Sequence, residues 1–227
     1  RMFKQMKEHK GVFPSIEEVL NIFGFEMYKE SESFTPLQYD RRMEQGKNVL
    51  TAYYEKYIGT FATNVEIEFK IPRYILDGVP VTGKIDKIEL DGDNCTVVDY
   101  KSGDPDRSSS QYTAAPNEKE PLGGDYWRQM LFYKLLIENY QDRNWKVKEG
   151  MFDYLERGSK TNEYKRIYIP LFEQEEEVVR KQLKDAYAAI MNHEFDNGCG
   201  KEDCYWCNFA RKYELVRPAE EIEIDDI

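Results

Sequence analysis

Apolar residues near the start of the chain recur with the period of an α-helix. They occupy positions 16, 19, 20 and 23, directly after Ser15, which we expect to cap this helix with Glu18 as its capping-box partner. A second helix is expected to begin at Thr35-Pro36, because proline is favoured in the first turn of a helix. The predicted helices after the first cover about residues 36–58, 125–140 and 173–193.

Between these helices, apolar positions alternate with polar ones, which predicts strands. Residues 65–69 alternate strictly, and turn residues at Asp77-Gly78 and Asp91-Gly92 separate this segment from two further strands. The predicted strands cover about residues 65–69, 81–90, 95–100, 148–156 and 164–170. We expect the first three to form a meander and the last two a hairpin. Elements in this order predict one α/β domain with a central mixed sheet flanked by helices.

Two carboxylates and a lysine fall on neighbouring predicted strands. Asp99 and Lys101 are two residues apart in an extended segment, so both side chains point to one face while Tyr100 points to the other. Asp86 lies in the preceding strand. Paired carboxylates on adjacent strands suit a hard cation, Mg²⁺ or Mn²⁺, with the main-chain carbonyl of Tyr100 as a further ligand. Lys101 can orient or deprotonate water, or stabilise charge on a phosphate. An isolated Asp-x-Lys is more often an ion pair at a sheet edge.

Three segments in order carry a resemblance to a known family. GKIDKIE from residue 83, VVDYKSG from residue 97 and QMLFY from residue 129 resemble the nuclease domain of the RecB-like branch of the PD-(D/E)xK superfamily. The resemblance covers about residues 36–210. It implies a restriction-endonuclease-like core and cleavage of DNA with Mg²⁺ or Mn²⁺. Such domains often lie at the C-terminus of UvrD-type helicases, so a helicase domain in the same chain or complex is the implied partner, acting in DNA repair or recombination.

The resemblance also assigns roles to particular residues. It implies that Asp86 is the first acid of the motif and that Asp99 and Lys101 form the (D/E)xK pair. Gln129 and Tyr133 match the Q-x-x-x-Y motif of the branch, one helical turn apart, and are the remaining catalytic candidates. By themselves these two residues would be read as ordinary helix surface and core.

One feature of the family is missing. The family often carries a histidine on its first core helix, a few residues after a glycine, whereas here Gly46 is followed by Lys-Asn-Val-Leu-Thr. Glu66, Glu68 or Glu44 are candidates to replace this metal ligand. Glu66 and Glu68 share one face of a predicted strand, and a solvated surface explains them equally well.

The charge of the chain leaves alternatives open. Its formal net charge is −11, which opposes binding to phosphates, although much of the acid excess falls in residues 173–177 and 220–226. The first interpretation is an active nuclease. The second is a weak or inactive nuclease-fold domain that serves as a DNA-binding or scaffold module, and the missing histidine and the acidic charge favour it. The third is a protein-interaction module of a repair complex. The intact Asp…Asp-x-Lys set favours the first.

Three of the four cysteines lie close together near the C-terminus: Cys199, Cys204 and Cys207. Their spacing resembles part of the iron–sulfur staple of AddB-type nucleases, which needs four thiolates. Alternatively, His193 could complete a tetrahedral zinc site with the three thiolates. A zinc site, an incomplete iron–sulfur site and a remnant without metal all remain open. Trp206 and Phe209 are expected to pack inward and couple this cysteine knuckle to the core.

These patterns predict an organisation and a location. The expected parts are an N-terminal helical extension over 1–35, a nuclease core over 36–195, the cysteine knuckle over 196–215 and an acidic tail over 216–227. No stretch approaches the roughly 20 apolar residues of a membrane span, so we expect no membrane association. The charged opening residues and the uneven cysteine spacing predict a cytoplasmic protein.

Overall fold

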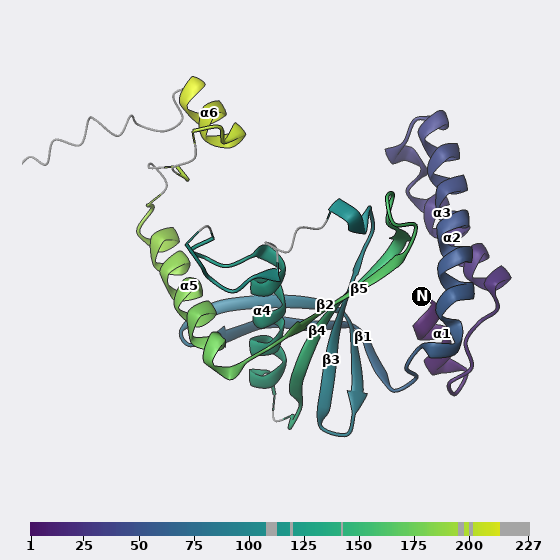
Figure 1. Cartoon of the computed structure of the whole chain (residues 1–227), viewed down its shortest axis with the longest axis horizontal. Helices are drawn as coiled ribbons and strands as arrows, with labels where there is room; N and C mark the ends of the chain where they lie inside the picture. Colours follow the sequence, from purple (N-terminus) through teal and green to yellow (C-terminus); the bar gives the residue numbers. More distant parts are fainter. Residues whose placement is uncertain (108–112, 119, 142, 195–197, 200–201, 214–227) are drawn as a thin grey trace, which may run out of the picture.

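Five strands form one sheet whose spatial order, β1-β2-β3-β4-β5, follows the sequence (Figure 1). The computed structural model describes residues 1–107, 113–118, 120–141, 143–194, 198–199 and 202–213. The strands are β1 (Val65–Leu76), β2 (Val79–Asp91), β3 (Asn94–Lys101), β4 (Lys146–Arg157) and β5 (Tyr164–Pro170). Neighbouring strands are antiparallel except β3 and β4, which are parallel. The expected mixed sheet is therefore confirmed.

Helices cover both faces of this sheet (Figure 1). The helices are α1 (Met2–Glu8), α2 (Ile16–Lys29), α3 (Pro36–Tyr57), α4 (Asp125–Asn139), α5 (Glu173–Met191) and α6 (Tyr205–Lys212). Short 3-10 turns are η1 (Ser31–Ser33), η2 (Ile58–Thr60) and η3 (Pro105–Arg107). Because β3 and β4 are parallel, the chain must cross over between them, and α4 makes this crossover.

Two apolar clusters, one on each face of the sheet, hold the helices against it. On one face, buried residues of α4 such as Trp127 and Leu131 pack on Val97 of β3 together with Val179 of α5. On the other face, α1 contributes Phe3 to an aromatic cluster, whose further buried members are Met6, Tyr53, Phe61 and Val65. The sheet is thus enclosed between α4 and α5 on one side and α1 and α3 on the other. The α/β class with helices on both faces is confirmed.

The predicted helix starts are found where the sequence placed them. Ser15 accepts a hydrogen bond from the Glu18 amide, the Glu18 side chain accepts one in return, and Thr35 forms the same box with Gln38. Helix α2 then packs on α3 at Gly46, where a Cβ atom would lie 2.1 Å from the ring of Phe23. A glycine at this point allows the two helices to approach closely.

Three elements differ from the prediction. Helices α1 and α6 were not expected, because seven and eight residues are too few to display a helical period. Strand β1 continues past Phe69, although Pro72 interrupts its pattern. The strand tolerates this proline because it lies at the edge of the sheet and its register with β2 shifts between Ile71 and Tyr74.

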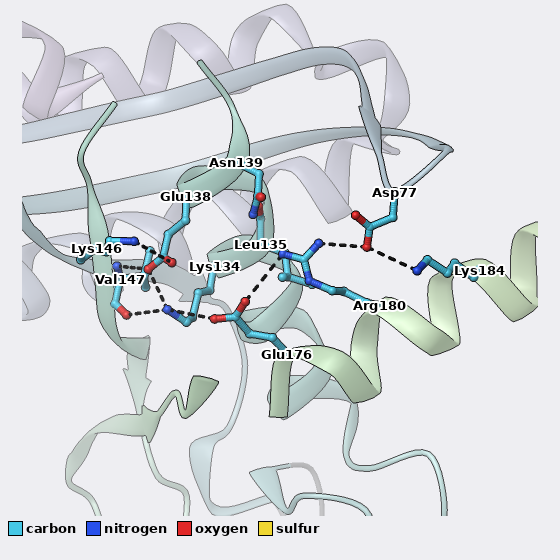
Figure 2. A network of polar contacts seen from close by, with 10 residues as sticks. All are labelled: Asp77, Lys134, Leu135, Glu138, Asn139, Lys146, Val147, Glu176, Arg180 and Lys184. Carbon is cyan, nitrogen blue, oxygen red and sulfur yellow. Dashed lines mark hydrogen bonds and ion pairs between the residues drawn. The ribbon is translucent and has the colours of Figure 1, made fainter. Parts of the chain in front are cut away.

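A network of charged side chains joins α5 to α4 and to the β1–β2 turn (Figure 2). The buried Lys134 ammonium lies 2.7 Å from Glu138 and 3.3 Å from Glu176. Arg180 pairs with Glu176 at 3.7 Å and with Asp77 at 3.0 Å. The carboxylates of Glu138 and Glu176 outweigh the effect of burial and raise the pKa of Lys134. The network fixes α5 on the same face of the sheet as α4.

Candidate active centre

Asp86 and Asp99 lie side by side on β2 and β3. Lys87 pairs with Val98 in the antiparallel register, which brings the preceding Asp86 next to Asp99. The main-chain N–H of Tyr100 donates a hydrogen bond of 3.1 Å to Oδ2 of Asp86. The Asp86 carboxylate is therefore held against β3, between the positions of Asp99 and Lys101.

Asp99 and Lys101 share the face of β3 that is covered by α4. The Lys101 ammonium lies 2.8 Å from Oδ2 of Asp99. Burial raises the pKa of Asp99, while the hydrogen bond and charge of Lys101 act in the opposite direction. The neighbouring charge of Asp86 raises this pKa further. A second positive charge at this point would relieve the repulsion between the two carboxylates.

Helix α4 contributes two polar side chains to the same centre. The Gln129 amide nitrogen donates to Oδ1 of Asp99 at 3.1 Å, and the Gln129 oxygen accepts from the Lys101 ammonium at 3.2 Å. The Tyr133 hydroxyl lies 3.0 Å from the Gln129 amide and 3.4 Å from Oδ1 of Asp99. Burial, with the charge of Asp99, raises the pKa of Tyr133 to about 12. Four side chains that the sequence separates by up to 34 positions thus form one hydrogen-bonded group.

The donor set fits a hard divalent cation. Asp86 and Asp99 offer carboxylate oxygens on one face, and Mg²⁺ commonly takes only one or two protein carboxylates and keeps several waters. The glutamates considered as replacement ligands lie elsewhere: Glu66 forms an ion pair with Lys7 at 3.0 Å, and Glu68 pairs with Lys84. Among the described residues, neither glutamate joins the two aspartates in a group of three close ligand atoms. Glu44 is exposed on α3.

The segment that follows Lys101 is held by a set of hydrogen bonds that the sequence analysis missed. Asp106 accepts main-chain N–H bonds from Lys160 and Thr161, at 2.8 and 2.9 Å, and pairs with Lys165 at 2.7 Å. These contacts lower the pKa of Asp106 strongly. Asp104 binds Ser159 in the same loop. The Asp-Pro-Asp sequence after the glycine was a turn signal that could have suggested this anchor.

The opposite face of the sheet carries a second polar cluster. Asp153 is fully buried, accepts a 2.6 Å hydrogen bond from the Tyr53 hydroxyl and lies 3.1 Å from Arg166. Lys87 is buried beside it, with its ammonium 5.2 Å from the ring of Tyr100. The alternation of the strand therefore separates Tyr100, on the aromatic side, from Asp99 and Lys101 on the α4 side.

The three cysteines of the knuckle come together. Their sulfur atoms lie within 4.8 Å of one another, and the Sγ atoms of Cys199 and Cys207 are 3.4 Å apart. Hydrogen bonds from Cys207 and Cys199 lower the pKa of Cys204 to about 7. Within the described part of the chain, no other group of three metal-binding side chains is this close, and His193 is not a member of this one.

The expected inward packing of the knuckle aromatics is wrong. Trp206 is 73% exposed and Phe209 is 41% exposed. Both rings lie on helix α6, which the sequence analysis did not anticipate and which stands beyond the end of α5, away from the sheet (Figure 1). The predicted acidic tail, 216–227, lies outside the described residues.

The comparison with protein families agrees with this arrangement. The sequence model of the PD-(D/E)XK nuclease superfamily matches residues 16–211. No curated protein matches the chain. A solved structure titled "Crystal structure of SSO0001" is similar with a TM-score of 0.38 and 17% sequence identity, over 83% of this chain and 84% of that chain. Within the described residues, we find no helix that is both long and apolar enough to span a membrane.

Proposed function

The chain belongs to the PD-(D/E)XK nuclease superfamily, and we propose that it is a metal-dependent nuclease that hydrolyses phosphodiester bonds in DNA. The observation that carries this proposal is the hydrogen-bonded group of Asp99, Lys101, Gln129 and Tyr133 beside Asp86. An ordinary surface ion pair would not need an amide that bridges both of its members.

Each residue of the centre has a role in this proposal. Asp86 and Asp99 hold Mg²⁺ or Mn²⁺, with the main-chain carbonyl of Tyr100 as a further ligand. The cation supplies charge neutralisation at the phosphate and lowers the pKa of bound water. Lys101 orients the attacking water or stabilises the negative charge that develops on the phosphate. Gln129 keeps the Lys101 ammonium and the Asp99 carboxylate in fixed positions, because it binds both.

The branch of the superfamily, the partner and the cellular role are proposed from the sequence resemblance. We propose that the domain belongs to the RecB-like branch and works in the cytoplasm with a helicase domain, in DNA repair or recombination. The match to the superfamily and the Gln129–Tyr133 pair on α4 support this assignment. Such a partner would also supply the basic surface that a chain with a net charge of −11 lacks.

A domain without turnover is the second candidate. It is favoured by the lack of a third acidic or histidine ligand close to Asp86 and Asp99 among the described residues. In that case the domain would bind DNA or position a helicase, and the cation would bind weakly. Activity and cation binding must therefore be measured separately.

One set of variants separates the two candidates. Purified protein is incubated with end-labelled single-stranded and duplex DNA in Mg²⁺ or Mn²⁺, and Mn²⁺ binding is followed by calorimetry. For an active nuclease, Asp99→Asn loses both Mn²⁺ binding and cleavage, whereas Lys101→Met keeps Mn²⁺ binding and loses most cleavage. Lys146→Met, at an exposed lysine on β4, is the control and should cleave normally. Absence of cleavage by the wild-type protein would favour the scaffold.

For the knuckle we propose a thiophilic metal ion held by Cys199, Cys204 and Cys207, with a fourth ligand from His193, from another part of the chain or from solvent. The close approach of the three sulfur atoms supports this proposal. Elemental analysis decides the ion: about one zinc per chain supports the zinc version, and iron supports an incomplete cluster. The absence of both metals supports a remnant. A bound structural ion also predicts that chelation lowers the melting temperature.

A further inference from the structure

A long groove lies beside the candidate active centre, on the same face of the sheet. It has a volume of about 960 Å³ and runs between α4, α5 and the first half of β2. This volume is at the upper end of the roughly 300–1,000 Å³ that small-ligand sites occupy. The groove is therefore large enough to take a nucleotide-sized group.

The groove is continuous with the catalytic group. Gln129 and Tyr133 line it, and the same two side chains bind Asp99. Asp99 and Lys101 do not line the groove themselves, so a group that contacts Gln129 and Tyr133 there is one side chain away from them. This continuity indicates that the occupant is part of the substrate rather than an unrelated ligand.

The lining of the groove does not suit a phosphate backbone. Its walls include the apolar side chains of Phe132, Val179 and Leu183. The cations at its rim already have acidic partners: Arg128 pairs with Asp125, and Lys84 pairs with Glu68. Nucleobases are better matched to these walls, because their flat, uncharged faces are stabilised by burial and by contact with aromatic rings.

Contacts between the elements on either side fix the position of the groove walls. The charged network of Figure 2 fixes α5 to α4 through Lys134 and Glu176. Gly83 lies on the β2 side of the groove, and a Cβ atom there would lie 2.4 Å from Leu136 of α4. Glycine therefore lets β2 and α4 pack closely along this edge.

We propose that the groove holds an unpaired nucleobase next to the bond to be cleaved, so that the substrate is single-stranded DNA or a single-stranded end. A base within a continuous duplex is stacked and paired, and bringing it into the groove would cost its unstacking and unpairing energy. An unpaired strand avoids this cost and gains burial of its base. The inference rests on the proposed nuclease function, because it identifies the occupant as substrate.

Two matched variants of α5 test this inference. Ala186 is exposed and lines the groove, while Ala188 is exposed on the same helix and lies outside it. Ala186→Glu puts a carboxylate in the apolar groove, and Ala188→Glu gives the same net charge elsewhere. Both positions are exposed and helical, so we expect both variants to fold, as circular dichroism would verify. Binding is measured by fluorescence anisotropy with one labelled oligonucleotide, as a single strand and as a blunt duplex, in Ca²⁺.

We expect Ala186→Glu to weaken binding of the single strand by at least about fivefold, since stacking of one base contributes about 1–3 kcal/mol. Ala188→Glu should change it less than about twofold, and neither variant should weaken duplex binding as much. Equal losses for the two variants, or equal losses for single strand and duplex, would overturn the inference.

Cleavage assays in Mg²⁺ test the groove assignment separately from the proposed nuclease function. If the wild-type protein cleaves DNA and Ala186→Glu cleaves the single strand at the same rate, the function stands and the groove assignment fails. If the wild-type protein cleaves nothing but binds single strands in a manner sensitive to Ala186→Glu, the groove assignment stands and the nuclease function fails.

Discussion

Replacing Lys134 by methionine tests how strongly the charged network of Figure 2 stabilises the fold. The Lys134 side chain is 5% exposed, and its partners Glu138 and Glu176 are 12% and 18% exposed. Methionine keeps most of the apolar stem but removes the charge. Two largely buried carboxylates then face each other without their shared cation.

The magnitude follows from the partners that remain. Removing one member of a buried ion pair costs about 3–5 kcal/mol. Glu138 keeps a 2.7 Å hydrogen bond from the Val147 main chain, and Glu176 keeps its contact with Arg180. We therefore expect a loss at or slightly below the bottom of this range, about 2–3 kcal/mol. For a chain of this size, that corresponds to a fall in melting temperature of roughly 5–10 °C.

The assay is urea unfolding of Lys134→Met beside Lys146→Met. The Lys146 ammonium lies 3.8 Å from the same Glu138, but its side chain is 64% exposed, so its loss should cost less than about 0.5 kcal/mol. The combined variant with Glu138→Gln and Glu176→Gln should recover much of the loss, because it removes the unpaired charges. Similar stabilities for Lys134→Met and Lys146→Met would refute the argument.

Three further perturbations have defined outcomes. Asp106→Asn should lower the melting temperature near neutral pH. The gap to the wild-type protein should begin to narrow as pH falls below about 4, the pKa of an unfolded aspartate, and should close only at still lower pH, because the pKa of Asp106 is lowered in the folded state. Gly46→Ala should destabilise by about 1–3 kcal/mol in urea unfolding despite its better helix propensity, because the new Cβ meets the Phe23 ring; a more stable variant would contradict this reasoning. Tyr53→Phe should cost about 1–3 kcal/mol in the same assay, since it leaves Asp153 short of a buried donor, and an unchanged midpoint would show that Arg166 suffices.

Much of the sheet and its carboxylate pair could be predicted from local signals. Period-two alternation and the turns at Asp77-Gly78 and Asp91-Gly92 located β1, β2 and β3, and the two-residue spacing of Asp99 and Lys101 placed both on one face. These features depend only on neighbours in the chain. Local pattern was therefore sufficient for the part of the centre that lies on the meander.

Long-range contacts were beyond the sequence patterns. The anchoring of Asp106 by residues of the β4–β5 hairpin joins positions 54 and 55 apart, and no periodicity reports such a contact. Helix α6 was missed because its eight residues are too few to display a helical period and the cysteine spacing suggested a turn. Trp206 was wrongly expected to be buried because large aromatic residues usually are. The groove depends on how α5 packs on α4, which the amphipathic pattern of each helix leaves undetermined.

The parallel pairing of β3 with β4 has a consequence for the order in which the chain assembles. Asp86 and Asp99 lie on strands joined by a tight turn, so they can meet as soon as the meander forms. Lys101 acquires its partner Gln129 only after α4 has formed, and β3 acquires its second neighbour only after the crossover returns at Lys146. Closing such a long segment is entropically costly and slow compared with forming a hairpin. During synthesis on the ribosome, Asp86 and Asp99 are therefore brought together before Gln129 is available to hold Lys101.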